Sequence, residues 1–172
     1  MAEIARSIAR VRVPLGFGCG LATLWLAHPT WASLASGVSL AATGESIRLW
    51  AAGHLEKGRE GTRSGPYRFT GHPLYLGSAV VGAGIAVASR SLIVAVIAVL
   101  YLGIAVGATV RSEETEMRAK FGRDYVEFRT APAGGAERRF SLARAFRNGE
   151  HRAIAGLAAA VILLALKTWL RL

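Results

Sequence analysis

The residues that could do chemistry in this chain stand at the ends of long apolar stretches. One polar motif, Ser64 to Gly77, leads into a charge-free stretch, and a second such stretch ends at Arg111-Ser112-Glu113-Glu114. Because only Ser89-Arg90-Ser91 separates the two stretches, we expect antiparallel neighbouring helices whose polar outer ends meet. The sequence therefore predicts a reactive site where these two motifs come together.

The first motif contains Gly-His-Pro-Leu-Tyr, and Pro73 is well suited to the first turn of a helix. We therefore expect a helix that begins at or just after His72, with a positive dipole end suited to a ligand carboxylate. His72 and Tyr75 would lie one turn apart and line one pocket, and the turn at Gly65-Pro66 would fold Tyr67 towards them. The alternative is an ordinary interfacial turn with a capping histidine and tyrosines of an aromatic belt.

The second motif places two adjacent acids, Glu113 and Glu114, at the edge of an apolar stretch. A carboxylate there is costly unless a cation or hydrogen-bond donors compensate it, so a cationic ligand would fit. The alternative is that both acids solvate a helix end beside Arg111 and Arg118. The segment that follows predicts an amphipathic helix against the bundle, with apolar residues at Phe121, Tyr125 and Phe128.

A further pair, Glu45 and Arg48, lies three residues apart on one face of a predicted span. Ionisable residues inside a membrane segment are functional candidates by default. Arg48 would orient an anionic group, and Glu45 would hold Arg48 or act as a base. A purely structural ion pair within the membrane is an equal alternative.

The composition indicates an integral membrane protein, with 52% hydrophobic residues and a mean hydropathy of +0.36. We expect an all-α fold, a polytopic transmembrane helical bundle of about five spans with cytoplasmic amphipathic helices, forming a single membrane domain over residues 1–172. Cytoplasmic segments at 53–72 and 111–132 would bind a ligand. The expected spans lie near residues 13–28, 31–52, 73–89, 91–110 and 153–169.

The charge distribution predicts how the chain is oriented. The formal charge is 21 − 11 = +10, and few of the basic residues, Arg90, Lys167 and Arg171, would lie on the outer face. The positive-inside rule then predicts a cytoplasmic N-terminus, in what we interpret as a bacterial inner membrane. Basic residues beside spans usually meet anionic lipid, so we expect the lipid bilayer as a partner and no nucleic acid.

Cysteine and histidine contribute little to the predicted chemistry. The single Cys19 cannot form an intrachain disulfide, and the four histidines are dispersed, so no metal site is expected. Two pairs with Gly-x-x-x-Gly spacing, Gly16 with Gly20 and Gly103 with Gly107, predict close helix packing. That packing would lie within the bundle or in a dimer, so the oligomeric state stays open.

A resemblance to a known family rests on the order and spacing of four motifs between Gly44 and Pro132. The motifs are Gly65-Pro66-Tyr67-Arg68, His72-Pro73-Leu74-Tyr75-x-Gly77, Glu113-Glu114, and Phe121-Gly122-x-x-Tyr125-x-x-Phe128 with Pro132 beyond it. This pattern resembles the membrane methyltransferases typified by isoprenylcysteine carboxyl methyltransferase, and phospholipid N-methyltransferases share much of it. The first and fifth expected spans lie outside the resemblance.

The resemblance implies a site for S-adenosylmethionine between the third and fourth spans. By the match of motifs, the cofactor would contact Tyr67 and the run His72, Pro73, Leu74 and Tyr75, and Glu113 would bind its charged end. One position departs from the family pattern, because Gly71 stands where the family usually has an arginine before the His-Pro. The charge would then come from Arg68, Arg111 or Arg48, or the activity would be altered.

The expected reaction is methyl transfer to a lipophilic or prenylated substrate that enters from the bilayer, most like carboxyl O-methylation of isoprenylcysteine. N-methylation of an ethanolamine phospholipid is the alternative. A carboxylate acceptor needs only a cation such as Arg48 or Arg111 to position it, whereas an amine must first lose a proton, to Glu45 or Glu114. A non-catalytic membrane protein that binds lipid or a partner subunit is the competing class.

Overall fold

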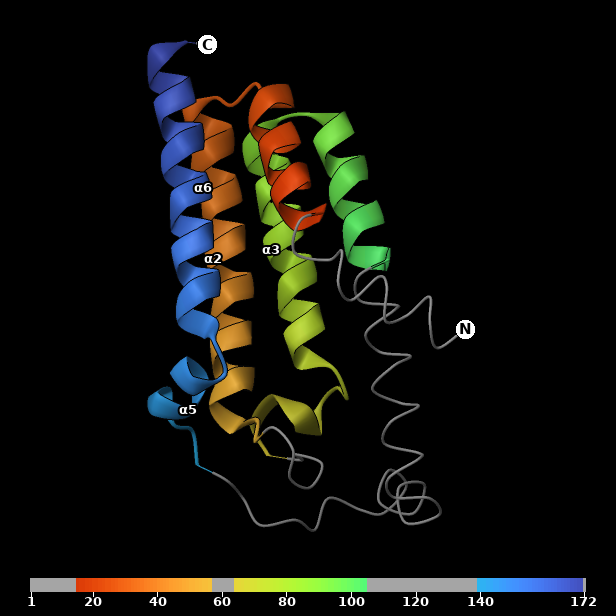
Figure 1. The fold of residues 1–172 in the computed structure, drawn as a ribbon, viewed down its shortest axis with the longest axis vertical. Helices are drawn as coiled ribbons and strands as arrows, with labels where there is room; N and C mark the ends of the chain where they lie inside the picture. The colour runs from red at the N-terminus through yellow and green to blue at the C-terminus, as the bar shows by residue number, and fades with distance from the viewer. Residues whose placement is uncertain (1–14, 57–63, 105–138, 172) are drawn as a thin grey trace.

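The computed structural model describes residues 15–56, 64–104 and 139–171, and this part of the chain is all-helical. The long helices lie side by side along the long axis of the molecule, and the short elements η1 and α5 lie near one end (Figure 1). The elements are helix Leu15–Leu26, α2 Trp31–His54, η1 Gly65–Arg68, α3 Pro73–Ser89, helix Leu92–Ile104, α5 Leu142–Arg147 and α6 Glu150–Leu170. The expected all-α class is confirmed for these residues.

Local hydrogen bonding sets where α2 and α3 begin. Thr30 caps α2 through a reciprocal pair of bonds with Ser33, in which each side chain accepts from the backbone N–H of the other residue. The α3 helix begins at Pro73, as predicted, and it ends where Arg90 adopts a left-handed conformation with φ of 51°. The short connection after α3 then leads to helix Leu92–Ile104, which packs back on α3 where Leu102 lies over Gly82.

Glycines bring the backbones of α2 and α3 into direct contact. A Cβ atom at Gly37 would lie 2.5 Å from the carbonyl oxygen of Gly84, and one at Gly44 would lie 2.7 Å from that of Gly77. Real Cβ atoms essentially never approach other atoms this closely, so side chains larger than hydrogen do not fit at these crossings. The two antiparallel helices are therefore packed as tightly as helices allow.

The Gly-x-x-x-Gly pairs singled out in the sequence do not have this role among the described residues. A Cβ at Gly20 or Gly103 would meet nothing within 4 Å, and one at Gly16 would meet only the Tyr101 side chain. Gly107 lies outside the described residues. Close packing of Gly20 and Gly103 against the described part of the bundle is therefore not found, because spacing alone does not tell which face of a helix is covered, and a dimer contact stays the alternative.

Helices occupy the described parts of all five predicted spans, but five membrane crossings are not confirmed. Of the helices in the described ranges, α6 alone is long and apolar enough to cross a membrane by length and composition. Only 6% of its most apolar window is buried within the protein. The helices Leu15–Leu26, α3 and Leu92–Ile104 are apolar but shorter.

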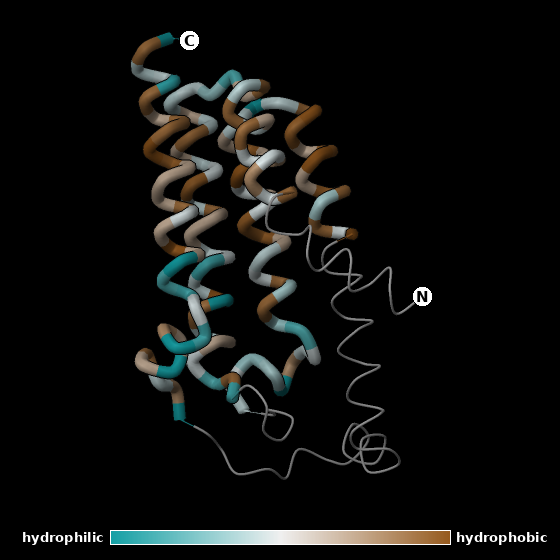
Figure 2. Tube along the Cα trace, viewed as in Figure 1, coloured by the Kyte–Doolittle hydropathy of each residue, from teal (hydrophilic) through white to brown (hydrophobic). Residues whose placement is uncertain are grey.

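The outer surface of the helices is nevertheless suited to lipid. Many large apolar side chains point outward, among them Trp25, Leu92 and Trp169, and the polar colours of Figure 2 gather at the end that carries η1 and α5. The exposed hydroxyls of α2 are satisfied within the helix, since each donates to the carbonyl four residues earlier. The exposed polar face of α2 therefore presents no hydroxyl that lacks an acceptor for its proton.

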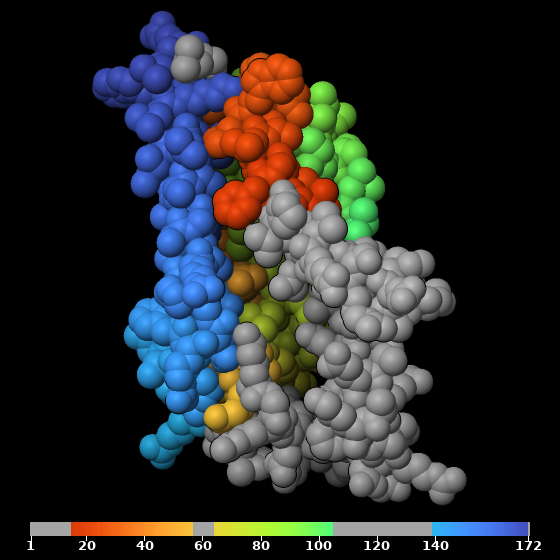
Figure 3. Space-filling view, viewed as in Figure 1, coloured from red at the N-terminus to blue at the C-terminus, as the bar shows by residue number. Residues whose placement is uncertain are grey.

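The α6 helix runs alongside α2 (Figure 1) and forms one edge of the molecule, next to helix Leu15–Leu26 near one end (Figure 3). Near its C-terminal end the Lys167 ammonium donates to the carbonyls of Leu24, at 2.7 Å, and Trp25, at 3.0 Å. These carbonyls belong to the last turn of helix Leu15–Leu26, where a cation is favourable. Beside them, Leu164 packs in a small core with Ala27, Leu34 and Ala88.

The glycine contacts make a direct prediction about stability. Replacing Gly84 by Ala places a Cβ 2.5 Å from the backbone nitrogen of Ala41 and should lower the free energy of unfolding by about 1–3 kcal/mol. The matched control Gly103→Ala adds the same methyl group to open space and should leave stability unchanged or slightly higher. Thermal unfolding in detergent, followed by tryptophan fluorescence, measures both, and equal effects would contradict the packing argument.

Candidate functional site

Four side chains from three helices form a partly buried ionic cluster near the end of the bundle that carries η1 and α5. The Arg48 guanidinium on α2 pairs through Nε with Glu45 Oε2 at 3.2 Å and through Nη2 with both carboxylate oxygens of Glu150 on α6, at 3.2 and 3.1 Å. Its Nη1 donates to the Ser78 hydroxyl on α3. We call Glu45, Arg48, Ser78 and Glu150 the ionic cluster.

The packing around the cluster holds the arginine in place. A Cβ at Gly77 would lie 2.6 Å from Arg48 Cγ, so the glycine lets the arginine stem lie flat against α3. The Ser78 hydroxyl also donates to the carbonyl of Leu74 at 2.9 Å, which orients its lone pairs towards Arg48. The side chains of Glu45, Arg48 and Glu150 are 12%, 21% and 7% exposed, so the charges are largely shielded from solvent.

The segment before α6 closes the C-terminal end of α2. The Asn148 amide donates to the carbonyls of Ala52, at 2.8 Å, and Leu55, at 2.9 Å, and the Arg144 guanidinium donates to that of Gly53 at 2.7 Å. These are carbonyls that an α-helix leaves unpaired at its end. Because Asn148 stands two residues before Glu150, the same contact brings Glu150 to Arg48.

The predicted cofactor residues gather where η1 meets α3. The His72 and Tyr75 rings lie with centroids 5.6 Å apart and planes tilted by 34°, so the two rings are neighbours one turn apart. Tyr75 and Ser78 are three residues apart on α3 and so share a helix face. The aromatic pair therefore borders the ionic cluster along α3.

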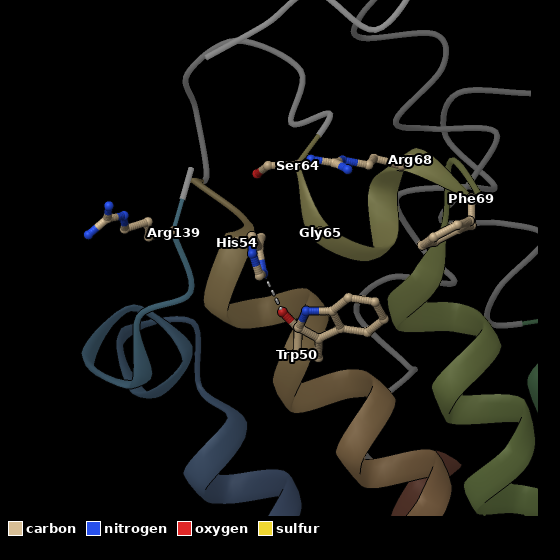
Figure 4. Close-up of a pocket in the computed structure, with 7 residues that line it drawn as sticks. All are labelled: Trp50, His54, Ser64, Gly65, Arg68, Phe69 and Arg139. Atoms are coloured by element: carbon tan, nitrogen blue, oxygen red, sulfur yellow. Dashed lines mark hydrogen bonds between the residues drawn. The ribbon is translucent and has the colours of Figure 1, made fainter. Parts of the chain in front are cut away.

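A pocket of about 580 Å³ lies between the end of α2 and η1 (Figure 4). It combines aromatic surface with cationic and hydroxyl groups, and the buried Ser64 hydroxyl has no hydrogen-bond partner within the described ranges. Pockets of this size hold small molecules. The lining residues are Trp50, His54, Ser64, Gly65, Arg68, Phe69 and Arg139.

Gly65 is required for the wall of this pocket. Its φ of +61° is a conformation that side-chain-bearing residues rarely adopt, and a Cβ there would lie 2.7 Å from the His54 ring. The His54 Nδ1 lies 2.9 Å from the Trp50 carbonyl, which can only accept, so Nδ1 carries a proton. In the neutral ring, Nε2 then remains as an acceptor.

The pocket and the ionic cluster lie on different faces of α2. Trp50 follows Arg48 by two residues, which is about 200° around an α-helix. The cluster instead faces α3 and α6, through Ser78 and Glu150. The end of the bundle therefore carries two separate features, joined through η1 and the first turns of α3.

The structure brings together the predicted residues Glu45 and Arg48, and separately Tyr67, His72, Pro73, Leu74 and Tyr75 near the start of α3. Arg111, Glu113, Glu114 and the segment 111–132 lie outside the described residues. Of the predicted cofactor residues that the structure describes, none lines the pocket, although Gly65 and Arg68 flank Tyr67 within η1. In the described ranges, no three His, Cys, Asp or Glu side chains gather as a metal would require.

Sequence reasoning missed Glu150 and most of the pocket lining. Trp50 and His54 carried a signal, since their i, i+4 spacing puts them on one helix face, and their rings lie with centroids 6.3 Å apart. Glu150 carried none, because it is separated from Arg48 by 102 residues. Only the folding of α6 against α2 makes them neighbours.

The comparison with known families gives one match that covers most of the chain. The family model for phospholipid methyltransferases matches residues 18–124. The chain belongs to the phospholipid methyltransferase family. No curated protein and no solved structure matches it.

The members of the phospholipid methyltransferase family are membrane proteins. Membership therefore implies that this chain is a methyltransferase that acts on lipid-like substrates. The predicted relationship to this group of membrane methyltransferases is confirmed. The match begins at residue 18, so it includes much of helix Leu15–Leu26, which was expected to lie outside the resemblance. It ends before α5 and α6, so the family pattern does not contain Glu150.

The hydrogen bonds from Asn148 to the C-terminal end of α2 can be tested by mutation in this member of the phospholipid methyltransferase family. The Asn148→Ala variant leaves two buried carbonyls without their donor and should lower the free energy of unfolding by about 1–3 kcal/mol. Arg147→Ala is the matched control, because Arg147 is an exposed neighbour on α5. Thermal unfolding in detergent measures both, and an Asn148→Ala variant as stable as the control would refute the role.

Proposed function

We propose that this protein transfers a methyl group from S-adenosylmethionine to the head-group amine of a membrane lipid. The reaction would take place at the bundle end where α2, η1, α3 and α6 meet, on the side predicted to be cytoplasmic. Family membership supports methyl transfer to a lipid-like substrate. The observation that favours an amine is the pairing of two carboxylates with the one guanidinium of Arg48.

The corner between η1 and α3 has chemistry that fits the cofactor. The aromatic pair His72 and Tyr75 presents ring faces that suit a sulfonium, and the start of α3 suits a carboxylate. The adjoining pocket adds the Trp50 indole, the Arg68 charge and the unpartnered Ser64 hydroxyl. We propose that these groups and Tyr67 hold the cofactor, with Glu113 at its charged end.

The charge of the ionic cluster favours an amine acceptor over a carboxylate. With both acids ionised, the formal charges of Arg48, Glu45 and Glu150 sum to 1 − 2 = −1. A substrate carboxylate would have to compete with two carboxylates already paired with Arg48. An ammonium head group would instead add the missing positive charge.

The chain's own residues would prepare the acceptor. When bound, the cofactor supplies a methyl group on a sulfonium sulfur, and an amine can take it only after losing a proton. Glu45 is placed to take that proton, since its Oε1 is buried and has no hydrogen-bond partner in the described part of the chain. The low exposure of the cluster would keep water from the reacting groups.

Gly71 does not obstruct this arrangement. It is exposed, and a Cβ at this position would meet nothing within 4 Å. A side chain at this position would therefore begin in open space with respect to the described atoms. We propose that Arg68, next to the same corner, supplies the charge in its place.

Cofactor binding is the first test. We expect purified protein in detergent to bind S-adenosylmethionine in calorimetry, and Gly65→Ala to weaken binding strongly because its Cβ would displace the His54 ring. Glu113→Gln should weaken binding by about tenfold or more, through the loss of one charged hydrogen bond. Gly71→Ala is the control and should bind normally.

The absence of binding by a folded sample would favour the competing class, a non-catalytic membrane protein. If Gly65→Ala and Gly71→Ala bind S-adenosylmethionine equally well, the corner between η1 and α3 is not part of the cofactor site. Circular dichroism and gel filtration of each variant establish that it is folded.

The acceptor is tested with methyl-labelled cofactor and extracted membrane lipids together with prenylated thiols. We expect label in the lipid fraction that stays non-volatile after mild base, because an N-methyl group is not released as methanol. Label released by base would indicate a methyl ester and hence a carboxylate acceptor of the isoprenylcysteine type. In that case the assignment of an amine would be wrong, whereas methyl transfer would stand.

A further inference from the structure

Glu150 lies in the first turn of α6 and yet completes a site otherwise built from α2 and α3. Its carboxylate contacts the Arg48 guanidinium with both oxygens, and its side chain is 7% exposed. It stands outside residues 18–124, which the family model matches. The α6 helix is therefore more than a membrane anchor appended to the family fold.

Residues from three helices contact the Arg48 guanidinium, which donates hydrogen bonds through Nη1 and Nη2, while its Nε has no hydrogen-bond partner among the described residues. Glu45 from α2 faces Nε, Ser78 from α3 accepts from Nη1, and Glu150 from α6 accepts from Nη2. Turning Nη1 or Nη2 towards an incoming anion would break the hydrogen bond to Ser78 or to Glu150. Glu150 thus determines whether Arg48 is available to a substrate.

Glu150 also determines the charge of the cluster. Without it, Glu45 and Arg48 would form a neutral pair when ionised, whereas with it the formal charge is −1 when both acids are ionised. The Glu45 Oε1 atom is buried without a hydrogen-bond partner among the described residues, so one carboxylate oxygen still lacks a donor. An alkylammonium group supplies both a donor and the compensating charge.

We infer that Glu150 is a positioning and specificity residue, which holds Arg48 away from anionic groups and leaves a negative charge that selects a cationic lipid head group. This inference rests on the proposed function, since it assigns the choice of acceptor to a residue of α6. The rival explanation is structural. In that case Glu150 only ties α6 to α2 and stabilises the start of a helix, where an acid is favourable.

Head-group preference separates these explanations, because a structural ion pair would not affect it. Purified protein in detergent is incubated without cofactor in an equimolar mixture of phosphatidylethanolamine and phosphatidylglycerol. The lipids retained are counted by native mass spectrometry. We expect the ethanolamine lipid to be retained preferentially, and Glu150→Gln to reduce the preference by about tenfold, since it keeps the shape but removes the charge.

Two variants serve as controls. Glu150→Asp keeps the charge and should keep the preference, even where its shorter side chain lowers stability. Glu56→Gln removes one negative charge near the same end of α2, where Glu56 pairs with Arg144 at 3.7 Å, and should also keep the preference. If Glu150→Gln does not fold, Glu45→Gln takes its place, because it neutralises the other carboxylate paired with Arg48. It should likewise reduce the preference for the ethanolamine lipid.

A wild-type protein without head-group preference, or a preference unchanged in Glu150→Gln, would overturn the inference. Because the measurement needs no cofactor, its outcome is independent of methyl transfer. A protein that prefers the amine lipid through Glu150 but methylates nothing would support the inference and refute the proposed function. The reverse pattern, with active enzyme and unchanged preference, would refute the inference alone.

Discussion

The direct backbone contact between α2 and α3 is the constraint on which the rest of the described structure depends. Gly37, Gly44, Gly77 and Gly84 allow two antiparallel helices to approach until a single methyl group would not fit between them. Helices this close leave no room for bulky side chains at the crossing points, so the functional residues lie at the end of the contact. Arg48 follows Gly44 by four residues on the same face of α2, and its stem lies across Gly77.

The ionic cluster is a consequence of this packing. A guanidinium in a poorly hydrated site is costly unless it is paired and hydrogen-bonded, and here three helices each supply one partner. The arrangement couples the positions of the helices to the charge of the site. A movement of α6 relative to α2 would change both the freedom of Arg48 and the net charge that a substrate meets.

The α5 and α6 helices give this protein a feature that the family pattern does not contain. Asn148 and Arg144 close the end of α2, Glu150 enters the ionic cluster, and Lys167 closes helix Leu15–Leu26 near the opposite end. One helix hairpin therefore satisfies backbone carbonyls near both ends of the bundle and contributes a charge to the candidate site. In an apolar environment such satisfied carbonyls matter, because water is not there to replace the lost hydrogen bonds.

The sequence by itself determined the helical class, the start of α3 at Pro73 and the pairing of Glu45 with Arg48, because these depend on local signals such as a first-turn proline or i, i+3 spacing. Family membership also followed from short motifs in a fixed order. The tertiary structure alone decided which glycines are covered and which acid reaches Arg48. Spacing predicted close packing at Gly20 and Gly103, where space is open, and gave no sign of Gly37 or Gly84. The physical reason is that a helix presents several faces, and only the packing of distant segments, such as Glu150 against Arg48, selects which face is used.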